Sequence, residues 1–217
     1  MTNPMSDDRV IRHRGPDRLF HWITAASVIV LLATGLLPQL GVRFDWVTLH
    51  WIVGLVLVAA ILYHLVRVIV RGSLATMRPT QADAAQLRAL LGGRPLRPGK
   101  YTLAQKAMHH GIALLCLAAA ATGLAMMVKL DTPLWTRNPY WLEADTWGGI
   151  YVVHGLAALC MVTAVMLHGY FALRPEKRCY LRAMLSGWMS RSDCAARHDP
   201  ALWPTTAPPG RDPETRP

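Results

Sequence analysis

Long apolar stretches alternate with short charged segments along this chain. Four windows lack Asp, Glu, Lys and Arg, and each is near or above the roughly 20 residues that a helix needs to cross a bilayer. These windows cover residues 19–42, 46–66, 107–128 and 146–173. The pattern predicts an all-α membrane protein. Its transmembrane domain, residues 19–173, is expected to be a four-helix bundle with helices at about 19–40, 46–70, 106–128 and 147–173.

The segments outside these windows are expected to be small. Residues 1–18 form a predicted N-terminal segment, and residues 174–198 a predicted amphipathic segment on the membrane surface. The connector between the second and third helices predicts a short surface helix over Gln81 to Leu91, ended by two glycines. Six prolines from residue 200 onward predict that residues 199–217 are disordered.

Basic residues are concentrated in three of the five segments outside the membrane. The N-terminal segment, the central connector and the segment after the fourth helix carry most of the Lys and Arg, whereas the other two loops together carry three basic and four acidic residues. The positive-inside rule therefore predicts that both termini face the cytoplasm. The net charge of +10 reflects this topology. Nucleic-acid binding, which needs a basic face on a soluble surface, is not expected.

The two halves of the chain resemble each other. His21 and His109 each stand twelve residues before an Ala-Thr-Gly-Leu run, and the next helix in each half carries two histidines fourteen residues apart. We therefore expect two copies of a helical hairpin, as in parallel transmembrane repeats. In this register the corresponding histidines are His21 and His109, His50 and His154, and His64 and His168.

These histidines mark two depths in the predicted bilayer. Fourteen residues rise about 21 Å along an α-helix and return to within about 40° of the starting face. His50 and His154 are expected toward the outer side, and the other four toward the cytoplasmic side. Histidines inside a bilayer are costly and usually functional. Although a lone imidazole could simply bond to a neighbouring helix, paired imidazoles from different helices are the axial ligands that a b-type haem needs.

Two further observations bear on a haem. No Cys-x-x-Cys-His motif occurs, so any haem is expected to be non-covalent. Of the remaining histidines, His13 and His198 are expected at the surface.

Several motifs resemble the cytochrome b (gamma) subunit of membrane-bound formate dehydrogenases, within a wider group that includes di-haem cytochromes b of nickel–iron hydrogenases. The motifs are Arg18-Leu-Phe-His21-Trp22, Leu49-His50, the pair His154 and His168, and Lys100-Tyr-Thr-Leu-Ala-Gln-Lys106. The likeness covers about residues 10 to 190.

The resemblance implies two haem b groups in a bacterial inner membrane. One is held by His50 and His154 on the periplasmic side, and the other by His21 and His168 on the cytoplasmic side. His64 and His109 are then unused copies. Because His64 departs from the family pattern, His64 with His168 remains an alternative inner pair, as in the cytochrome b of respiratory bc complexes.

The resemblance also implies a quinone site near Tyr101, Thr102, Gln105 and His168. Thr102 and Ala104 replace an Asn and a Gly of the family motif, and the alternative is that Tyr101 and Gln105 merely anchor the third helix at the interface. A threonine hydroxyl can still bond to a quinone carbonyl.

The implied function is an electron-transfer subunit of a respiratory complex. It would carry electrons from a periplasmic iron–sulfur subunit, itself joined to a catalytic subunit, through two haems to a quinone on the cytoplasmic side. No other substrate chemistry is expected. Two alternatives are a stand-alone di-haem cytochrome b that oxidises a small donor such as superoxide, and a haem-free membrane anchor or metal transporter. The mildly acidic outer loops disfavour an anionic donor.

Overall fold

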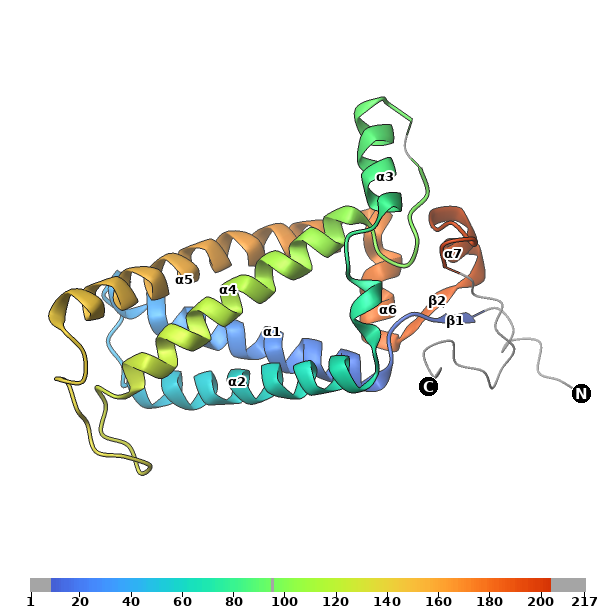
Figure 1. The fold of residues 1–217 in the computed structure, drawn as a ribbon. Coiled ribbons are helices and arrows are strands. Elements are labelled where there is room, and N and C mark those ends of the chain that lie inside the picture. Colours follow the sequence, from blue (N-terminus) through green and yellow to red (C-terminus); the bar gives the residue numbers. More distant parts are fainter. Residues whose placement is uncertain (1–8, 95, 204–217) are drawn as a thin grey trace, which may run out of the picture. The chain divides into compact units, whose positions relative to one another are not determined.

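The computed structural model describes residues 9–94 and 96–203, and four long helices dominate it (Figure 1). Each helix is long and apolar enough to cross a membrane. They are α1 (Gly15–Leu36), α2 (Val47–Val70), α4 (Leu103–Met127) and α5 (Ala144–Leu173). The predicted all-α fold with four spanning helices is confirmed.

Helix α1 begins and ends earlier than its apolar window. Pro16 stands in its first turn, where the missing N–H costs nothing, and Asp17 follows near the positive end of the helix dipole. Pro38 has no N–H with which to continue the α-helical hydrogen bonds, and a short 3₁₀ turn, η1 (Pro38–Leu40), follows. The apolar window therefore marks the part of the chain suited to lipid and not the bounds of the helix.

The chain forms two compact units, which are described separately. The bundle unit comprises Phe20–Tyr63 and His110–His168. The terminal unit comprises the described residues of Met1–Leu19, His64–His109 and Gly169–Pro217.

One residue from each long helix forms the core of the bundle unit. Val28 of α1, Leu57 of α2, Cys116 of α4 and Met161 of α5 pack into a single buried cluster. Each of these residues follows a histidine of its own helix by seven residues: His21, His50, His109 and His154. The repeat seen in the sequence thus extends to the packing of the core.

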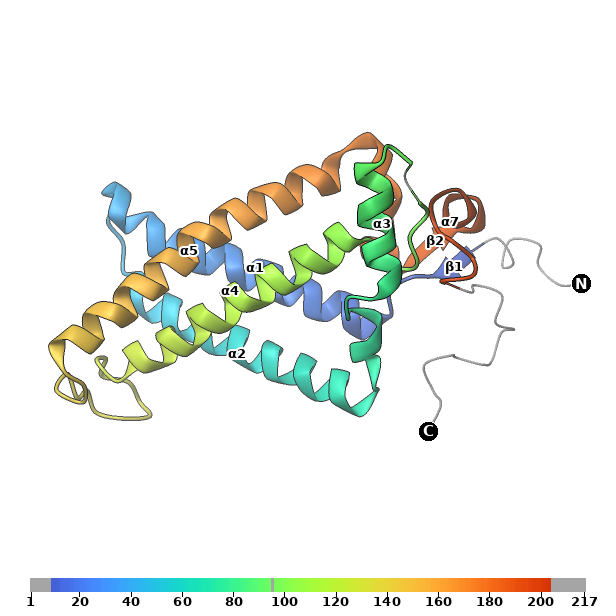
Figure 2. The same ribbon diagram turned by 45° about the horizontal axis from the view of Figure 1, so that its top comes forward.

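Large apolar side chains cover much of the helices' outer surface. Ile29 and Leu62 are more than half exposed, as are Leu114 and Val152 (Figure 2 shows the helices that carry them). Apolar surface on this scale marks an interaction face. On helices of this length, it fits contact with lipid.

The terminal unit has a small core of its own. Strand β1 (Arg9–Ile11) pairs antiparallel with β2 (Trp188–Ser190), with Val10 opposite Met189. Val10, Met189 and Cys194 form the buried cluster. Helices α6 (Arg178–Ser186) and α7 (Arg191–Arg197) flank β2 in the chain, and the short turns η2 (Ser73–Thr76) and η3 (Pro175–Lys177) complete the unit.

Within the amphipathic segment expected over residues 174–198, the structure has two short helices and a strand in place of one continuous helix. Helix α6 ends at Gly187, whose φ of +93° is left-handed and favours glycine. A Cβ at this position would also lie 3.0 Å from the carbonyl oxygen of His13. The chain therefore turns sharply at Gly187 and continues as β2.

The prediction that His198 lies on the surface is wrong. His198 is 1% exposed and Arg12 is 2% exposed, and an Arg12 nitrogen lies 3.1 Å from His198 Nε2. Arg12 also donates to the carbonyl oxygen of Lys100, and its guanidinium lies over the ring of Tyr180. Ordered contacts continue to Trp203, which packs on this cluster, beyond the boundary expected at residue 198. The rest of the expected disordered tail, residues 204–217, lies outside the described residues.

These contacts predict that the terminal unit loosens at acid pH. His198 Nδ1 donates to the carbonyl oxygen of Gly99, so Nε2 accepts from Arg12 only while the ring is neutral. Burial lowers the pKa of His198, and the charges of Arg12 and Arg197 lower it further. The hydrogen bond to Gly99 raises the pKa but does not outweigh these effects. The unfolded chain therefore takes up a proton at a higher pH than the folded chain. The contribution of His198 to the free energy of unfolding is fully present above about pH 6.5 and is lost as the pH falls below that value.

Limited proteolysis at pH 8 and pH 5.5 measures this loss. We expect faster cleavage between residues 178 and 203 at the lower pH, and a His198→Gln variant whose cleavage no longer changes with pH. His13→Gln, which removes a histidine beside Tyr101, should keep the wild-type pH dependence. Equal pH dependence in wild type and His198→Gln would contradict the assignment.

Helix α3 (Gln81–Leu91) has the bounds that the sequence predicted. Thr80 caps it and exchanges bonds with Asp83 in a capping box. Asp83 Oδ2 also lies 2.7 Å from Lys106 Nζ, and their side chains are only 4% and 9% exposed. Burial alone would raise the pKa of Asp83, but hydrogen bonds from Lys106 and Thr80 outweigh it and hold the pKa below its usual value. This buried ion pair joins α3 to the start of α4.

Candidate haem sites

Six histidines of the long helices face one another in three pairs. The first pair is His50 of α2 and His154 of α5, whose ring centroids lie 6.3 Å apart. The second pair is His21 of α1 and His168 of α5, at 6.2 Å. The third pair is His64 of α2 and His109 of α4, at 6.4 Å. In the structure His168 therefore faces His21, while His64 faces His109.

These separations suit two imidazoles bound to one metal ion from opposite sides. Two metal–nitrogen bonds of about 2 Å each, together with the distance from each nitrogen to its ring centre, give about 6 Å between centroids. A tetrahedral ion would bring two rings closer together. The rings are therefore spaced as axial ligands of a haem.

Threonines orient both imidazoles of the first pair. Thr34 Oγ1 lies 2.8 Å from His50 Nδ1, and Thr122 Oγ1 lies 2.9 Å from His154 Nδ1. Each hydroxyl donates its own hydrogen to a backbone carbonyl four residues earlier in its helix. It must therefore accept from Nδ1–H of the imidazole, which leaves Nε2 of each ring free to bind a metal.

Glycines let the same two imidazoles approach their neighbouring helices. A Cβ at Gly35 would lie 3.6 Å from His50 Cε1, and one at Gly123 would lie 3.4 Å from His154 Cε1. An alanine would just fit, whereas a larger side chain would push the ring away. The Ala-Thr-Gly-Leu run thus supplies an orienting hydroxyl and a space for the ring, in both halves of the chain.

The role of the threonine in the Ala-Thr-Gly-Leu run was not predicted from the sequence, in which the run indicated only that the two halves correspond. The sequence did contain a signal for this role, because a hydroxyl residue at the same place in both apolar helices is costly to bury unless it has a hydrogen-bond partner.

Polar atoms without partners mark the second pair. His21 Nδ1 and Thr24 Oγ1, one turn further along α1, are buried with no hydrogen-bond partner among the described residues. Buried polar atoms are normally satisfied, so each such exception needs an explanation. A bound cofactor or ordered water beside His21 would provide one. The residues of the first two pairs therefore fit a haem.

The structure gives Thr102 and Gln105, two residues of the expected quinone site, a local role. Thr102 N–H donates to Gln105 Oε1, and Gln105 N–H donates to Thr102 Oγ1. These reciprocal bonds form a capping box at the start of α4. Tyr101, just before them, lies against the guanidinium of Arg12. These contacts favour the alternative in which Gln105 anchors the start of α4. The hydroxyl of Thr102 acts as an acceptor here, so its own hydrogen can still be donated to another group.

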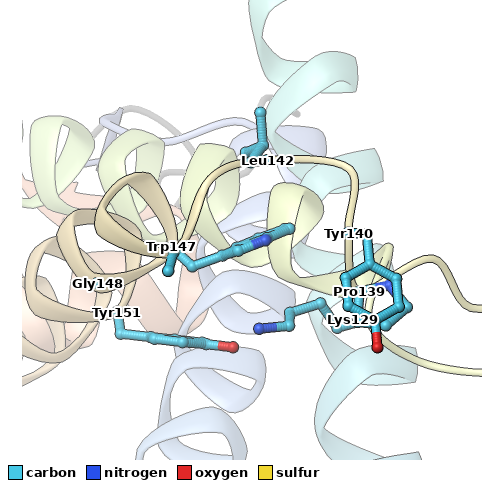
Figure 3. Close-up of a pocket in the computed structure, with 8 residues that line it drawn as sticks. Lys129, Pro139, Tyr140, Leu142, Trp147, Gly148 and Tyr151 are labelled. Atoms are coloured by element: carbon cyan, nitrogen blue, oxygen red, sulfur yellow. The ribbon is translucent and has the colours of Figure 1, made fainter.

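A donor-lined hollow opens beside the loop between α4 and α5. Figure 3 shows the Lys129 ammonium between the rings of Trp147 and Tyr151, at 4.6 and 5.1 Å from their centroids. Trp147 Nε1 is buried without a hydrogen-bond partner in the described part of the chain. The hollow has a volume of about 480 Å³, and Tyr140 on its rim is 93% exposed. Its charged and polar groups are chiefly donors, which suits a group rich in oxygen acceptors.

A bare metal ion has little to bind in these helices. Across residues 9–94 and 96–203, no three or more His, Cys, Asp or Glu side chains gather where they could hold one. Structural and catalytic ion sites usually take at least three protein ligands. Two ligands suffice for a haem, because the macrocycle supplies the other four.

The spanning helices and the facing histidine pairs define a membrane-bound cytochrome b, an electron-transport protein. Comparison with known proteins agrees. The chain belongs to the prokaryotic cytochrome b561 family, whose model matches residues 12–187.

A named relative comes from Escherichia coli. The cytochrome b556(fdo) subunit of formate dehydrogenase from strain K12 is 27% identical over 208 residues, covering 89% of this chain and 91% of that subunit. The same subunit from strains O6:H1 and O157:H7 gives the same values. The resemblance inferred from the motifs is confirmed.

Proposed function

We propose that this chain is the haem-binding membrane subunit of a formate dehydrogenase-like respiratory complex, with haem b at the first and second histidine pairs. When bound, the haems supply one-electron transfer across the bilayer between a partner protein and a quinone. The observation that carries the proposal is the pairing of His50 with His154 and of His21 with His168 at the separation of axial ligands.

The protein's own residues would set the properties of these sites. Thr34 and Thr122 fix the orientation of both imidazoles at the first pair, and hydrogen bonds of this kind make a ligand more basic. Within the described part of the chain, the second pair has no such bond at His21 Nδ1. Since ligand basicity and hydrogen bonding tune haem potentials, the two sites would differ in potential.

The distribution of charge supports an orientation in a bacterial inner membrane. With both termini in the cytoplasm, the first pair lies toward the periplasm and the second toward the cytoplasm. An electron moving inward then works against the membrane potential, which conserves about 2.3 kcal/mol per 100 mV.

An iron–sulfur subunit would contact the loop between α4 and α5. Tyr140 and Trp141 are 93% and 56% exposed there, and exposed aromatic residues are typical of interfaces. The ammonium group of Lys129 in the adjoining hollow would donate hydrogen bonds to a carboxylate of the partner. The named relative, a formate dehydrogenase subunit, supports such an assembly.

The quinone would bind on the cytoplasmic side, near His168. His168 is the exposed member of the second pair. Tyr101, Thr102 and Gln105 remain the proposed contacts from the start of α4, with the hydroxyl hydrogen of Thr102 as the donor to a quinone carbonyl.

Haem counting tests the proposal. The full chain is purified in detergent, and haem b per chain is measured spectroscopically for wild type, His50→Ala, His21→Ala and the control His13→Ala. Each of the first two variants should lose one haem per chain, and the control none. Full haem content in both His50→Ala and His21→Ala would refute the assignment.

Co-purification tests the partner. Isolated from its native membrane, the tagged chain should bring down an iron–sulfur protein, and Lys129→Glu should reduce the yield of that protein while keeping the haem content. An isolated chain that nevertheless reduces quinone with superoxide would favour the stand-alone alternative.

A further inference from the structure

We infer that helix α3 binds the surface of the lipid bilayer, through a stripe of leucines and flanking arginines that recognise anionic phospholipids. This helix lies in the connector between α2 and α4, and neither the proposed haem sites nor the proposed partner uses it. The surface requires only that the four long helices span a membrane, so it is independent of the haem ligands and of the partner.

The apolar stripe of α3 consists of Leu87, Leu90 and Leu91. At these spacings of three and four residues, the three side chains lie on one face of the helix. Their exposed fractions are 45%, 64% and 80%. On a helix that packs against a protein core, such a stripe is the buried face. The described part of the chain therefore leaves the stripe of α3 uncovered.

The buried ion pair of Asp83 and Lys106 holds this face of α3 at the edge of the membrane. Asp83 precedes Leu87 by four residues and Leu90 by seven, so it lies on the same face as the stripe. Lys106, 2.7 Å from Asp83, is the last charged residue before the uncharged stretch 107–128 of α4. Figure 1 shows α3 running at a steep angle to α4. The face that meets α4 at the lipid boundary thus continues outward as the stripe.

The charges around the stripe favour an anionic surface. Arg88 stands between the leucines in the sequence and Arg94 follows the end of the helix, and both are exposed. Asp83 is the only acidic residue between residues 71 and 106, and Lys106 already neutralises it. Arginines beside a membrane are attracted to anionic lipids, and a guanidinium matches the geometry of a phosphate. A lipid surface, unlike a purely acidic protein surface, also takes up the leucines.

Together these features define an interfacial amphipathic helix. Eleven residues are too few to span the hydrocarbon, so α3 lies in the plane of the membrane surface. Its leucines enter the boundary between headgroups and acyl chains, and its arginines donate hydrogen bonds to lipid phosphates. The capping box of Thr80 and Asp83 forms the helix before it meets lipid, so little order has to be gained on binding.

Hydrogen exchange of the full chain in nanodiscs tests this surface. The discs contain either phosphatidylcholine alone or equal parts of phosphatidylcholine and phosphatidylglycerol. The backbone amides of α3 should exchange on the order of 10-fold more slowly in the discs with phosphatidylglycerol, because lipid bound through arginines holds the helix against local opening. Equal exchange in the two discs overturns the inference.

Matched substitutions separate the arginines from the leucines. Arg88→Gln should reduce the effect of phosphatidylglycerol by about 5-fold, and Leu90→Gln should speed the exchange of α3 in both discs. The controls Arg137→Gln and Leu134→Gln change exposed residues of the loop between α4 and α5 and should leave α3 unchanged. The amides of α2 and α4 should exchange at the wild-type rate in every variant, which excludes misfolding. Wild-type exchange of α3 in both Arg88→Gln and Leu90→Gln contradicts the assignment.

Brominated lipids show whether the stripe itself enters the membrane. Leu90→Trp places a fluorophore on the stripe, whereas Gln81→Trp places one on the opposite face of α3, nine residues away. The added fluorescence is obtained by subtracting that of the eight native tryptophans. Bromine in the acyl chains should quench it in Leu90→Trp and much less in Gln81→Trp. Equal quenching in the two variants overturns the orientation of the helix and with it the inference.

Two other occupants of the stripe predict different results. If a second copy of the chain covers it, protection of α3 appears in detergent without lipid and rises with protein concentration. If another subunit covers it, protection appears only in the intact complex. Either result overturns the inference. None of these measurements involves haem, so the haem content of His50→Ala and His21→Ala decides the proposed function separately.

Discussion

Asp83→Ala is expected to destabilise the terminal unit by about 3–5 kcal/mol, the usual cost of leaving one charge of a buried pair without its partner. Of its bonds to the described residues, Lys106 Nζ would keep the one to the carbonyl oxygen of Arg78, in a site where its side chain is 9% exposed. The variant also loses the capping bonds with Thr80 at the start of α3. The rate of proteolysis between residues 70 and 106, compared with wild type at neutral pH, measures the change.

Two controls separate charge from capping. Asp83→Asn keeps a hydrogen-bonding side chain at the cap, so its loss of stability should be smaller. In the double variant Asp83→Ala and Lys106→Met, no buried charge is left without a partner, and much of the lost stability should return. A double variant as unstable as Asp83→Ala alone would show that the cap, and not the ion pair, dominates.

Thr34→Val and Thr122→Val are each expected to weaken haem binding at the first pair by about 10- to 100-fold, the usual effect of removing a hydrogen bond that orients a metal-bound histidine. Valine has nearly the shape of threonine but leaves Nδ1–H of His50 or His154 without its acceptor. Titration of haem into the purified apoprotein, followed by absorbance, gives the affinity.

Serine provides the matched control for this prediction. Thr34→Ser and Thr122→Ser retain the hydroxyl and should bind haem almost as wild type does. The two valine variants should have similar effects, because the two threonines occupy equivalent places in the repeat. Wild-type affinity in both would mean that packing alone orients the rings.

The sequence was sufficient for the helices and for the depths of the histidines. Windows without charge located the four spans, and the fourteen-residue spacings placed His50 and His154 apart from His64 and His168. Spacing along one helix says nothing about how that helix is rotated against its neighbours. For this reason the partners of His168 and His64 had to come from the structure.

Contacts between distant parts of the chain were the least predictable. Arg12 and His198 are separated by 186 residues, and each taken alone resembles an ordinary surface residue. His198 is buried because residues distant in the sequence, among them Tyr180 and Trp203, pack around it. Likewise, the capping box of Thr102 and Gln105 uses groups that the resemblance assigned to a quinone.

The core of the bundle unit also bears on how such a chain could arise. Val28 matches Cys116, and Leu57 matches Met161, so the packing at the centre is that of two similar hairpins. Two identical hairpins could assemble in the same way as separate molecules. His50 and His154 would then be one residue contributed twice, and any change at that site would occur on both sides together. Joining the hairpins in a single chain removes this constraint, and each half can then acquire its own residues around a ligand that both inherited.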